Sequence, residues 1–238
     1  MHDLMTQDLA ADYQDIFNIR GRLYHQAMQV YPGVRASEFL NVIREARITS
    51  GMSVLDVPSG GAYLSRYLEG IELVSLETSA TFANLASGHK KHVCLYDNHA
   101  FPLKDACMDR VLSIAGLHHV NEKERIFSEM RRVVRPGGRI VLADVAGDSY
   151  VRPFLDDFVG RYCETGHSGW YFDETTRSEL RNAGLNIAAD KRLDYLWCAP
   201  DMASLSTFCR LLFGMVHAEP ATVAEGIRKY LGVRELGD

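Results

Sequence analysis

The sequence predicts an α/β protein with a doubly wound, mostly parallel Rossmann-like sheet of seven strands, or six, covered by helices on both faces and by a helical cap. Two observations predict this class. Between residues 53 and 145, short runs of continuous apolar character alternate with amphipathic helical patterns, as in parallel sheets that helices cover on both faces. The run that begins at Ser53 also ends in a turn of small residues, Pro58-Ser59-Gly60-Gly61. Such turns are typical of strand-loop-helix units in which the backbone of the loop comes close to a ligand.

Composition and charge fit one globular domain. The chain has 238 residues, 47% apolar and 24% charged, with a net charge of −5. We divide it into an N-terminal helical cap at residues 1–50, a core at 51–146, and a substrate-cap insert with the end of the sheet at 147–238. The acidic balance argues against a nucleic-acid surface. No run approaches the roughly 18 apolar residues of a membrane span, and Met1–Ala11 carries acids rather than a basic, apolar leader. We therefore expect a cytoplasmic monomer or homodimer without a membrane span.

Cysteine and histidine spacing predicts neither disulfides nor a metal. The five cysteines are scattered without a C-x-x-C pair, which indicates free thiols. His89 and His92 flank two lysines, and no carboxylate stands at ligand spacing from them.

The first two thirds of the chain divide into a helical region and alternating strands and helices. Apolar spacing predicts helices within Asp3–Ile48, broken at Tyr31-Pro32-Gly33. The expected strands are the run that begins at Ser53, then Ile71–Leu76, Val93–Tyr96, Asp109–Ala115 and Arg139–Val145. The expected helices carry Ala62 to Leu68, Ala80–Ala86, and Glu122–Val134, the last ended by Arg135-Pro136-Gly137-Gly138.

The pattern changes after Ala146. The expected elements there are a helix at Tyr150–Cys163, an aromatic loop at Gly166–Phe172, a helix at Asp173–Asn182, a sixth strand at Asn186–Leu196, and helices at Ala203–Val216 and Ala221–Leu231. A seventh strand is expected from a hairpin at Tyr195–Ala199. The alternatives are an open sheet edge or one that a partner subunit completes.

Polar side chains stand at or just after the ends of the expected strands: Asp56, Glu77, Asp97 and His118-His119. Ligands of doubly wound sheets bind beyond these ends. Glu77 lies about 20 residues past the first strand, the spacing at which an acid pairs with ribose hydroxyls. The residues alone thus predict a nucleoside-bearing cofactor and leave a nicotinamide open.

Four segments in order carry a family resemblance: VLDVPSGG, LVSLETS, CLYDNHAFPLKDACMDRVLSIAGLHHV and EMRRVVRPGGRIVLADV. Over roughly Met52–Val145 the chain resembles the class I S-adenosylmethionine-dependent methyltransferases of the ubiquinone/menaquinone-methyltransferase-like, type 11 group. The resemblance implies S-adenosylmethionine as cofactor and S-adenosylhomocysteine as product. The cofactor-binding residues that it implies are Asp56, Ser59, Gly60, Gly61, Glu77, Thr78, Asp97, Asn98 and Ala115.

The loop after the first strand departs from the family pattern D-x-G-x-G-x-G. Pro58 stands at the first glycine position, where it can neither adopt a positive φ nor donate an N–H. We therefore expect the cofactor contacts on Ser59, Gly60 and Gly61. The alternative is a loop that no longer binds the cofactor.

Methyl transfer needs a nucleophile held in line with the methyl group, and a base helps a hydroxyl, carbon or amine acceptor. Three histidines are the candidate catalytic residues: His118, His119 and His167. Tyr24, Trp170 and Tyr171 are the candidate substrate-binding residues, which favour an apolar or aromatic acceptor. The alternative is structural: the histidines cap a helix or pack on the cofactor, and the aromatic loop fills the cap.

The function expected from these features is methyl transfer to oxygen or carbon of a small, apolar or aromatic metabolite. The alternative is a methyltransferase-like binding or scaffold protein without catalysis. A nicotinamide oxidoreductase is disfavoured, because the sequence contains neither a G-x-G-x-x-G turn nor a Tyr-x-x-x-Lys pair.

Overall fold

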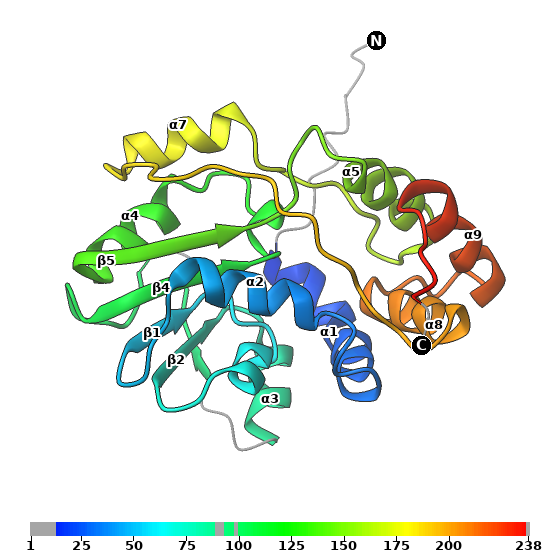
Figure 1. The fold of residues 1–238 in the computed structure, drawn as a ribbon, viewed down its shortest axis with the longest axis horizontal. Helices are drawn as coiled ribbons and strands as arrows, with labels where there is room; N and C mark the ends of the chain where they lie inside the picture. Colours follow the sequence, from blue (N-terminus) through cyan, green and yellow to red (C-terminus); the bar gives the residue numbers. More distant parts are fainter. Residues whose placement is uncertain (1–12, 89–92, 98–99, 237–238) are drawn as a thin grey trace, which may run out of the picture.

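The computed structural model describes residues 13–88, 93–97 and 100–236 and shows an α/β fold with a parallel sheet (Figure 1). Within these residues the sheet has five strands in the order β3-β2-β1-β4-β5. They are β1 (Ser53–Asp56), β2 (Glu72–Glu77), β3 (Val93–Leu95), β4 (Met108–Ile114) and β5 (Val134–Ala143). Every neighbouring pair is parallel. The order reverses between β1 and β4, which is where doubly wound sheets bind ligands.

The sheet lies between two apolar layers because successive side chains of a strand point to opposite faces. Val54 belongs to one buried cluster, which continues into the N-terminal helices and the cap. Leu55, the next residue, belongs to a second cluster, with Phe127 and Met130 of α4 (Glu124–Val133). The continuous apolar character of β1 therefore reflects burial on both faces, as expected.

Further helical segments surround the sheet. They are α1 (Tyr13–Val30), α2 (Ala36–Ala46), α3 (Ala80–Gly88), α5 (Val151–Pro153), α6 (Gly160–Tyr162), α7 (Glu174–Asn182), α8 (Met202–Leu212) and α9 (Pro220–Tyr230), with the π-helical turn η3 (Phe154–Val159) between α5 and α6. The break expected at Tyr31-Pro32-Gly33 separates α1 from α2. These helices confirm the expected ones within a few residues, except that residues 3–12 of the expected region Asp3–Ile48 lie outside the described residues. The exception follows β1, where the expected helix is a short 3-10 turn, η1 (Tyr63–Tyr67).

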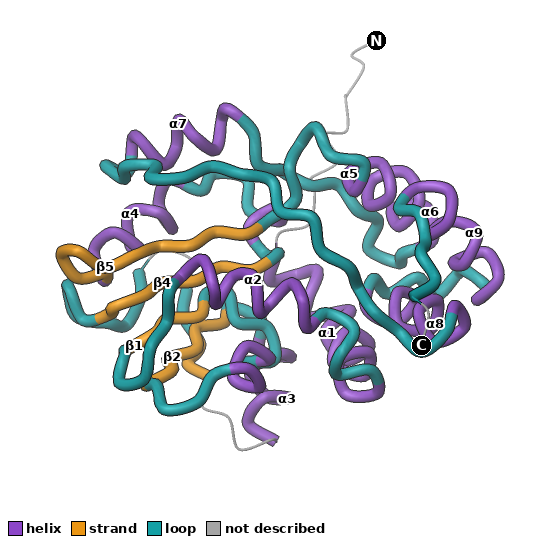
Figure 2. The backbone as a smooth tube through the Cα atoms, in the orientation of Figure 1, coloured by secondary structure: helices purple, strands orange, loops and turns teal. Residues whose placement is uncertain are grey.

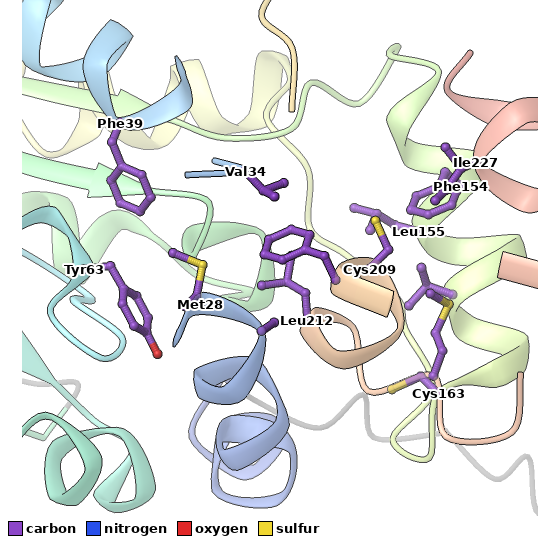
Figure 3. Close-up of a cluster of buried hydrophobic side chains, with 14 of the residues drawn as sticks. Met28, Val34, Phe39, Tyr63, Phe154, Leu155, Cys163, Cys209, Leu212 and Ile227 are labelled. Atoms are coloured by element: carbon purple, nitrogen blue, oxygen red, sulfur yellow. The ribbon is translucent and has the colours of Figure 1, made fainter. Parts of the chain in front are cut away.

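The cap is built from helices that are distant in the sequence. Helix α2 packs on β4 and β5, whereas α1 packs on α8, and α8 packs on α9. Figure 1 shows α5, α8 and α9 together beside the sheet. Figure 3 shows the apolar layer running from Phe39 and Tyr63 near the sheet to Phe154 and Ile227 in the cap. The N-terminal cap and the C-terminal region therefore share one core with the sheet.

The expected sixth strand at Asn186–Leu196 and the hairpin at Tyr195–Ala199 are wrong. Residues 185–200 form no strand, and most of their side chains are exposed. Figure 2 shows this segment as a loop that passes β5 on its way to α8. Its charged side chains instead pair with other elements: Lys191 with Glu45 at 2.7 Å and Arg192 with Asp148 at 2.6 Å. The sheet formed by the described residues is therefore five-stranded, not six- or seven-stranded.

Strand β5 also begins earlier than expected. The structure has it start at Val134, directly after α4, and include Arg135-Pro136-Gly137-Gly138, which the sequence suggested as a turn. A register shift between Met108 and Arg110 of β4 absorbs these residues. None of the described helices has the length and apolar character to cross a bilayer.

Candidate active site

A small cavity lies at the carboxyl ends of β1 and β4, where the strand order reverses. Its volume is about 30 Å³, and its lining is Tyr13, Phe17, Tyr24, Arg35, Phe39, Asp56, Pro58, Ser59, Gly60, Tyr63, Phe82, Ile114, Ala115 and Gly116. That volume is about the share of one water molecule. Aromatic side chains fill the rest of the space, since the ring of Tyr24 lies 5.9 Å from that of Tyr63 and 5.3 Å from that of Phe82. A ligand larger than water must therefore displace aromatic side chains here.

Most of the cofactor residues implied by the sequence lie at or next to this cavity. Asp56, Ser59, Gly60 and Ala115 line it. Asp97 follows β3, is exposed, and accepts a hydrogen bond from the Ala100 N–H at 3.2 Å. Asn98 lies outside the described residues, as do His89 and His92.

Glu77, the last residue of β2, is fully buried directly behind the cavity. Its Oε1 accepts hydrogen bonds from the N–H groups of Thr78 and Ser79, both at 2.9 Å. Its Oε2 accepts the Gly60 N–H at 2.6 Å and the Tyr13 hydroxyl at 3.1 Å. A carboxylate offers about four acceptor positions, so these donors occupy all of them. A hydroxyl of a ligand can bond to Glu77 only by replacing one donor.

The loop after β1 uses its N–H groups within the protein. Ser59 donates to the Leu76 carbonyl at 2.9 Å, and Gly60, with φ of 55°, donates to Glu77. A Cβ at Gly61 would lie 2.5 Å from the ring of Tyr63, so the close approach of this ring requires glycine there. In this conformation the loop offers the Ser59 hydroxyl, rather than the N–H groups of Ser59 and Gly60, to a ligand.

Three buried hydroxyls at the ends of neighbouring strands have no hydrogen-bond partner within the described part of the chain: Ser59 after β1, Thr78 after β2 and Ser113 in β4. Buried polar groups are otherwise nearly always paired, because leaving one unpaired costs free energy. Of the three, Ser59 lines the cavity, so a ligand with hydroxyl, amine or carboxylate groups would pair its hydroxyl there. The polar set at these strand ends therefore fits a nucleoside cofactor with an amino-acid end.

The three candidate histidines form one cluster beside the cavity. His118 and His119 lie in η2 (Leu117–His119), which follows β4, and His167 lies in the loop after α6. The ring centroids are 4.1 Å apart for His118 and His119, 5.7 Å for His118 and His167, and 5.3 Å for His119 and His167. The ring of His119 also lies 5.3 Å from that of Phe17, which lines the cavity. We refer to these three residues as the histidine cluster.

Two carboxylates that the sequence did not single out contact the histidine cluster. Asp144, just after β5, has Oδ1 2.6 Å from Nδ1 of His118, and its Oδ2 accepts the N–H groups of Leu117 and His118. Asp156 in η3 has Oδ1 3.4 Å from Nδ1 of His167. Asp144 stands in the segment RIVLADV, so the rule that selected acids at strand ends could have found it. Asp156 lies on a helical turn and carries no such signal.

Burial keeps two members of the cluster uncharged at neutral pH. It lowers the pKa of His119 well below the usual value. For His167, burial outweighs the hydrogen bond to Asp156, which raises the pKa, and the pKa is about 4. The neighbouring imidazoles act in the same direction as burial on both residues. The Nδ1 atom of His119 is buried and has no hydrogen-bond partner among the residues that the structure describes. Uncharged imidazoles can accept a proton or bind a metal ion.

A buried arginine lies near the histidine cluster. Nη2 of Arg20 donates to the Leu212 carbonyl at 3.3 Å, whereas its Nε and Nη1 have no hydrogen-bond partner in the described ranges of the chain. Burial lowers the pKa of Arg20, and its charge contributes to the lowered pKa of His119 and of His167. The site therefore holds a buried cation, Arg20, near the imidazoles of His119 and His167.

The candidate substrate residues lie in different settings. Tyr24 lines the cavity, and its hydroxyl accepts a hydrogen bond from Arg35. Tyr171 is buried, donates to Asp156 and stacks on His118 with ring centroids 5.9 Å apart. Trp170 is 46% exposed, and its backbone N–H donates to the His118 carbonyl at 2.7 Å. The predicted aromatic loop is thus confirmed as a loop, and it is attached to the histidine cluster.

A larger cavity of about 440 Å³ lies against α4 and α7, away from the strand-end cavity. Its lining is Glu122, Glu124, Arg125, Ser128, Glu129 and Glu179. It shares no lining residue with the cavity at the strand ends and includes neither a cluster histidine nor an unpaired strand-end hydroxyl. We therefore place the candidate active site at the strand ends.

Sequence comparisons match this core. The family model described as "Methyltransferase domain" matches residues 55–142. A methyltransferase named GfsG from Streptomyces halstedii is 31% identical over 122 residues, 46% of this chain and 42% of that protein. A demethylmenaquinone methyltransferase from Renibacterium salmoninarum is 31% identical over 104 residues, 42% of this chain and 44% of that protein. The chloroplastic tocopherol O-methyltransferase of Arabidopsis thaliana is 26% identical over 158 residues, 59% of this chain and 45% of that protein. The chain thus spans less than half the length of these three relatives.

Solved structures share the fold. A S-adenosylmethionine-dependent methyltransferase from Thermotoga maritima, described as a possible histamine N-methyltransferase, has a TM-score of 0.59 at 21% identity and covers 71% of this chain and 79% of its own. The cyclase SpnF has a TM-score of 0.64 at 18% identity and covers 93% of this chain and 92% of its own. At these identities the likeness shows the fold alone.

Proposed function

We propose that the chain is a class I S-adenosylmethionine-dependent methyltransferase that transfers a methyl group from this cofactor to oxygen or carbon of a small, apolar or aromatic molecule. The match of residues 55–142 to the methyltransferase domain model and the related methyltransferases support this proposal. One observation carries the proposal. The buried Glu77 and the hydroxyls of Ser59, Thr78 and Ser113, which have no partner among the described residues, stand at neighbouring strand ends. The histidine cluster lies beside the cavity at these strand ends. This arrangement provides a polar cradle for the cofactor and an ionisable group beyond it.

The cradle would hold S-adenosylmethionine, whose sulfonium activates the methyl group. The residues proposed to bind it are Asp56, Ser59, Gly60, Gly61, Glu77, Thr78, Asp97, Asn98 and Ala115. Glu77 would accept ribose hydroxyls in place of the Tyr13 hydroxyl, the one side-chain donor among the four that the described residues give it. The Ser59 hydroxyl would pair with a polar group of the cofactor. Pro58 shapes this loop but donates no hydrogen bond.

The acceptor would lie between the cavity and the histidine cluster. Aromatic side chains surround that position, which favours a flat or apolar molecule, and we assign Tyr24, Trp170 and Tyr171 to its binding. The relatives named tocopherol O-methyltransferase and demethylmenaquinone methyltransferase support a small-molecule acceptor. Excluding water and holding the nucleophile about 3–3.5 Å from the methyl carbon supply most of the catalysis.

The histidine cluster would ease the loss of the acceptor's proton. His118, His119 and His167 are buried, and their rings converge beside Phe17 at the edge of the cavity. Asp144 holds His118 in one orientation, and Asp156 lies beside His167. A nucleophile that gives up its proton as the methyl group arrives reacts faster, so all three are the proposed catalytic residues.

The proposal is tested by calorimetric titration with S-adenosylhomocysteine, followed by transfer of a labelled methyl group to a panel of phenols, enols and quinols. We expect binding in the micromolar range and labelled product from at least one acceptor class. Because the shared fold of a cyclase shows that this architecture does not by itself specify methyl transfer, both measurements are needed. Absence of cofactor binding would refute the proposal, and binding without transfer to any acceptor would refute its catalytic part.

A matched pair of variants locates the cofactor. Ser59→Ala removes a buried hydroxyl that lacks a partner among the described residues, so the free protein should keep its stability while cofactor affinity falls about 5- to 10-fold, the worth of one hydrogen bond. Ser178→Ala removes an exposed hydroxyl on α7, which bonds to Glu174, and serves as the control. Equal affinities for the two variants would place the cofactor elsewhere.

A further inference from the structure

We propose that the histidine cluster is a binding site for one divalent transition-metal ion, of the class that includes Zn²⁺ and Co²⁺. This inference rests on the proposed function and specifies how the cluster would ease deprotonation of the acceptor. One ring nitrogen from each of His118, His119 and His167 lies within 4.8 Å of the others. Three protein imidazoles with an open fourth position form a known catalytic zinc arrangement. The sequence alone predicted no metal, because only the fold brings His167 to the other two.

The outer nitrogens of two imidazoles already face carboxylates. Nδ1 of His118 lies 2.6 Å from Asp144, and Nδ1 of His167 lies 3.4 Å from Asp156. Histidines that bind metals almost always give the second ring N–H to such a group, which fixes the ring and raises the basicity of the ligating nitrogen. The carboxylates thereby leave Nε2 of His118 and of His167 for an ion.

The third imidazole, His119, has a nitrogen in need of a partner. Its side chain is buried, and its Nδ1 has no hydrogen bond to any residue that the structure describes. The Phe17 and Tyr13 rings meet it edge to face, at centroid distances of 5.3 and 6.3 Å, and supply no acceptor or donor to Nδ1.

The charges around the cluster permit a divalent cation. Asp144 and Asp156 contribute two negative charges at the outer nitrogens. Arg20, which is buried, and Arg152, whose Nε lies 3.5 Å from Asp156, contribute positive charge. Arg152 is half exposed, and water screens it more than it screens the carboxylate of Asp144. The buried Lys123 adds a further positive charge near Asp144. The contacts of the two carboxylates with the histidine rings, rather than a net negative charge, would therefore stabilise a bound cation.

The open position of the ion would face the acceptor, since the Phe17 and Tyr13 rings beside His119 also line the cavity. An oxygen of the acceptor, a phenol or enol, would become the fourth ligand, and the ion would lower its pKa. Its O–H bond breaks, the proton passes to water, and the electron pair stays on oxygen. That pair then forms the C–O bond to the methyl group, while the C–S bond breaks and its electrons return to sulfur.

The test uses the whole chain without a histidine tag, freed of metal by a chelator and then titrated with Co²⁺. We expect one equivalent to bind with the visible absorption of a tetrahedral or five-coordinate site, and Zn²⁺ to displace it. His119→Ala and His167→Gln should each weaken Co²⁺ binding at least 100-fold. His217→Ala, an exposed histidine outside the cluster, should bind as the wild type does. Wild-type protein that binds no Co²⁺, or cluster variants that bind it as the wild type does, would overturn the proposal.

Two controls distinguish a failure of the metal proposal from a failure of the proposed function. Titration of each variant with S-adenosylhomocysteine reports whether the core still folds and binds cofactor, so lost metal binding at unchanged cofactor affinity supports the site. Metal-free wild-type protein that methylates its acceptor at the full rate would overturn the metal proposal and leave the proposed function standing. Failure to bind the cofactor would refute the proposed function, while the Co²⁺ count would still decide the metal site.

Discussion

The Nδ1 atom of His118 lies 2.6 Å from Oδ1 of Asp144, and the two side chains are only 7% and 1% exposed. The same carboxylate accepts the N–H groups of Leu117 and His118, at 2.8 and 3.1 Å. Burial acts to raise the pKa of Asp144, but the His118 imidazole and the backbone N–H groups of Val145 and His118 outweigh it and hold the pKa below its usual value. Asp144 therefore links the end of β5 to the histidine cluster as a charged acceptor.

Replacing this acceptor with an amide should disorient the cluster. In Asp144→Asn the negative charge is lost, and one oxygen that faces a donor becomes an NH₂ group. Loss of a carboxylate behind a functional histidine typically costs 10- to 100-fold in activity or metal affinity. We expect a loss of this size in methyl transfer, with cofactor affinity nearly unchanged, measured by single-turnover kinetics and calorimetry. Wild-type rates in this variant would show that Asp144 has a structural role alone.

The cofactor edge could be predicted from the sequence because it depends on local rules. A carboxylate at a strand end and a turn of small residues are enough to identify Glu77 and Ser59-Gly60. Tyr13 carries no such signal. It reaches Glu77 only because α1 packs on α3, beside β2. The residues were thus predictable, whereas the donor that competes for Glu77 was not.

The histidine cluster and the edge of the sheet also could not be predicted from local sequence rules. His118 and His119 are adjacent in the chain, but His167 joins them only through the path of the loop after α6. At the sheet edge, Asn186–Leu196 contains enough apolar residues to suggest a strand. Its charged residues pair with Glu45 and Asp148 on other elements, and the segment runs as a loop. Tertiary partners decided both outcomes, and local composition does not encode them.

The pKa of Glu77 predicts a pH dependence of stability. Burial raises this pKa from 4.5 to about 7, although its hydrogen bonds oppose the shift. Between these values the folded state binds more protons than the unfolded state, so the free energy of unfolding falls as pH rises from about 4.5 to 7 and levels off above that. The contribution is at most about 3 kcal/mol. Urea denaturation at several pH values gives the free energy of unfolding of the wild type and of Glu77→Gln. The difference between the two proteins should change between about pH 4.5 and 7, and a difference that does not change with pH would contradict the assignment.

The same carboxyl should release a proton when the cofactor binds. Near pH 7 it is about half protonated in the free protein. Two ribose hydroxyls in place of the single Tyr13 hydroxyl would add a donor, which favours the carboxylate and lowers its pKa. Calorimetric titration of S-adenosylhomocysteine at pH 7, in buffers with different ionisation enthalpies, should show release of a fraction of a proton. The release should disappear in Glu77→Gln. Proton uptake, or no exchange in the wild type, argues against ribose binding at this residue.

The hydroxyl of Tyr13 should compete with the cofactor. It donates to Oε2 of Glu77 at 3.1 Å and, within the described residues, is the only side-chain donor among the four on that carboxylate. Tyr13→Phe frees that acceptor position and keeps the ring, so we expect the apparent cofactor affinity to rise about 5-fold, the worth of one neutral hydrogen bond. The free protein should lose about 1 kcal/mol of stability for the same reason. Weaker cofactor binding in this variant would instead mean that the hydroxyl contacts the cofactor.

Replacing Gly116 should lower both stability and cofactor affinity, because this residue packs against Pro58 of the loop after β1 and directly precedes η2, which carries His118 and His119. A Cβ there would lie 2.7 Å from Cγ and 3.3 Å from Cδ of Pro58, and 3.5 Å from the Tyr13 ring. The proline ring cannot rotate away, so one of the two loops must shift, and overpacking of this kind costs about 1–3 kcal/mol.

In Gly33→Ala the added methyl group meets nothing within 4 Å among the described residues, which makes it the matched control. We expect Gly116→Ala to lower both the free energy of unfolding and the affinity for S-adenosylhomocysteine, because Gly116 and Pro58 both line the cavity. If Gly116→Ala matches Gly33→Ala in urea denaturation and in calorimetry, the contact between the two loops does not shape the site.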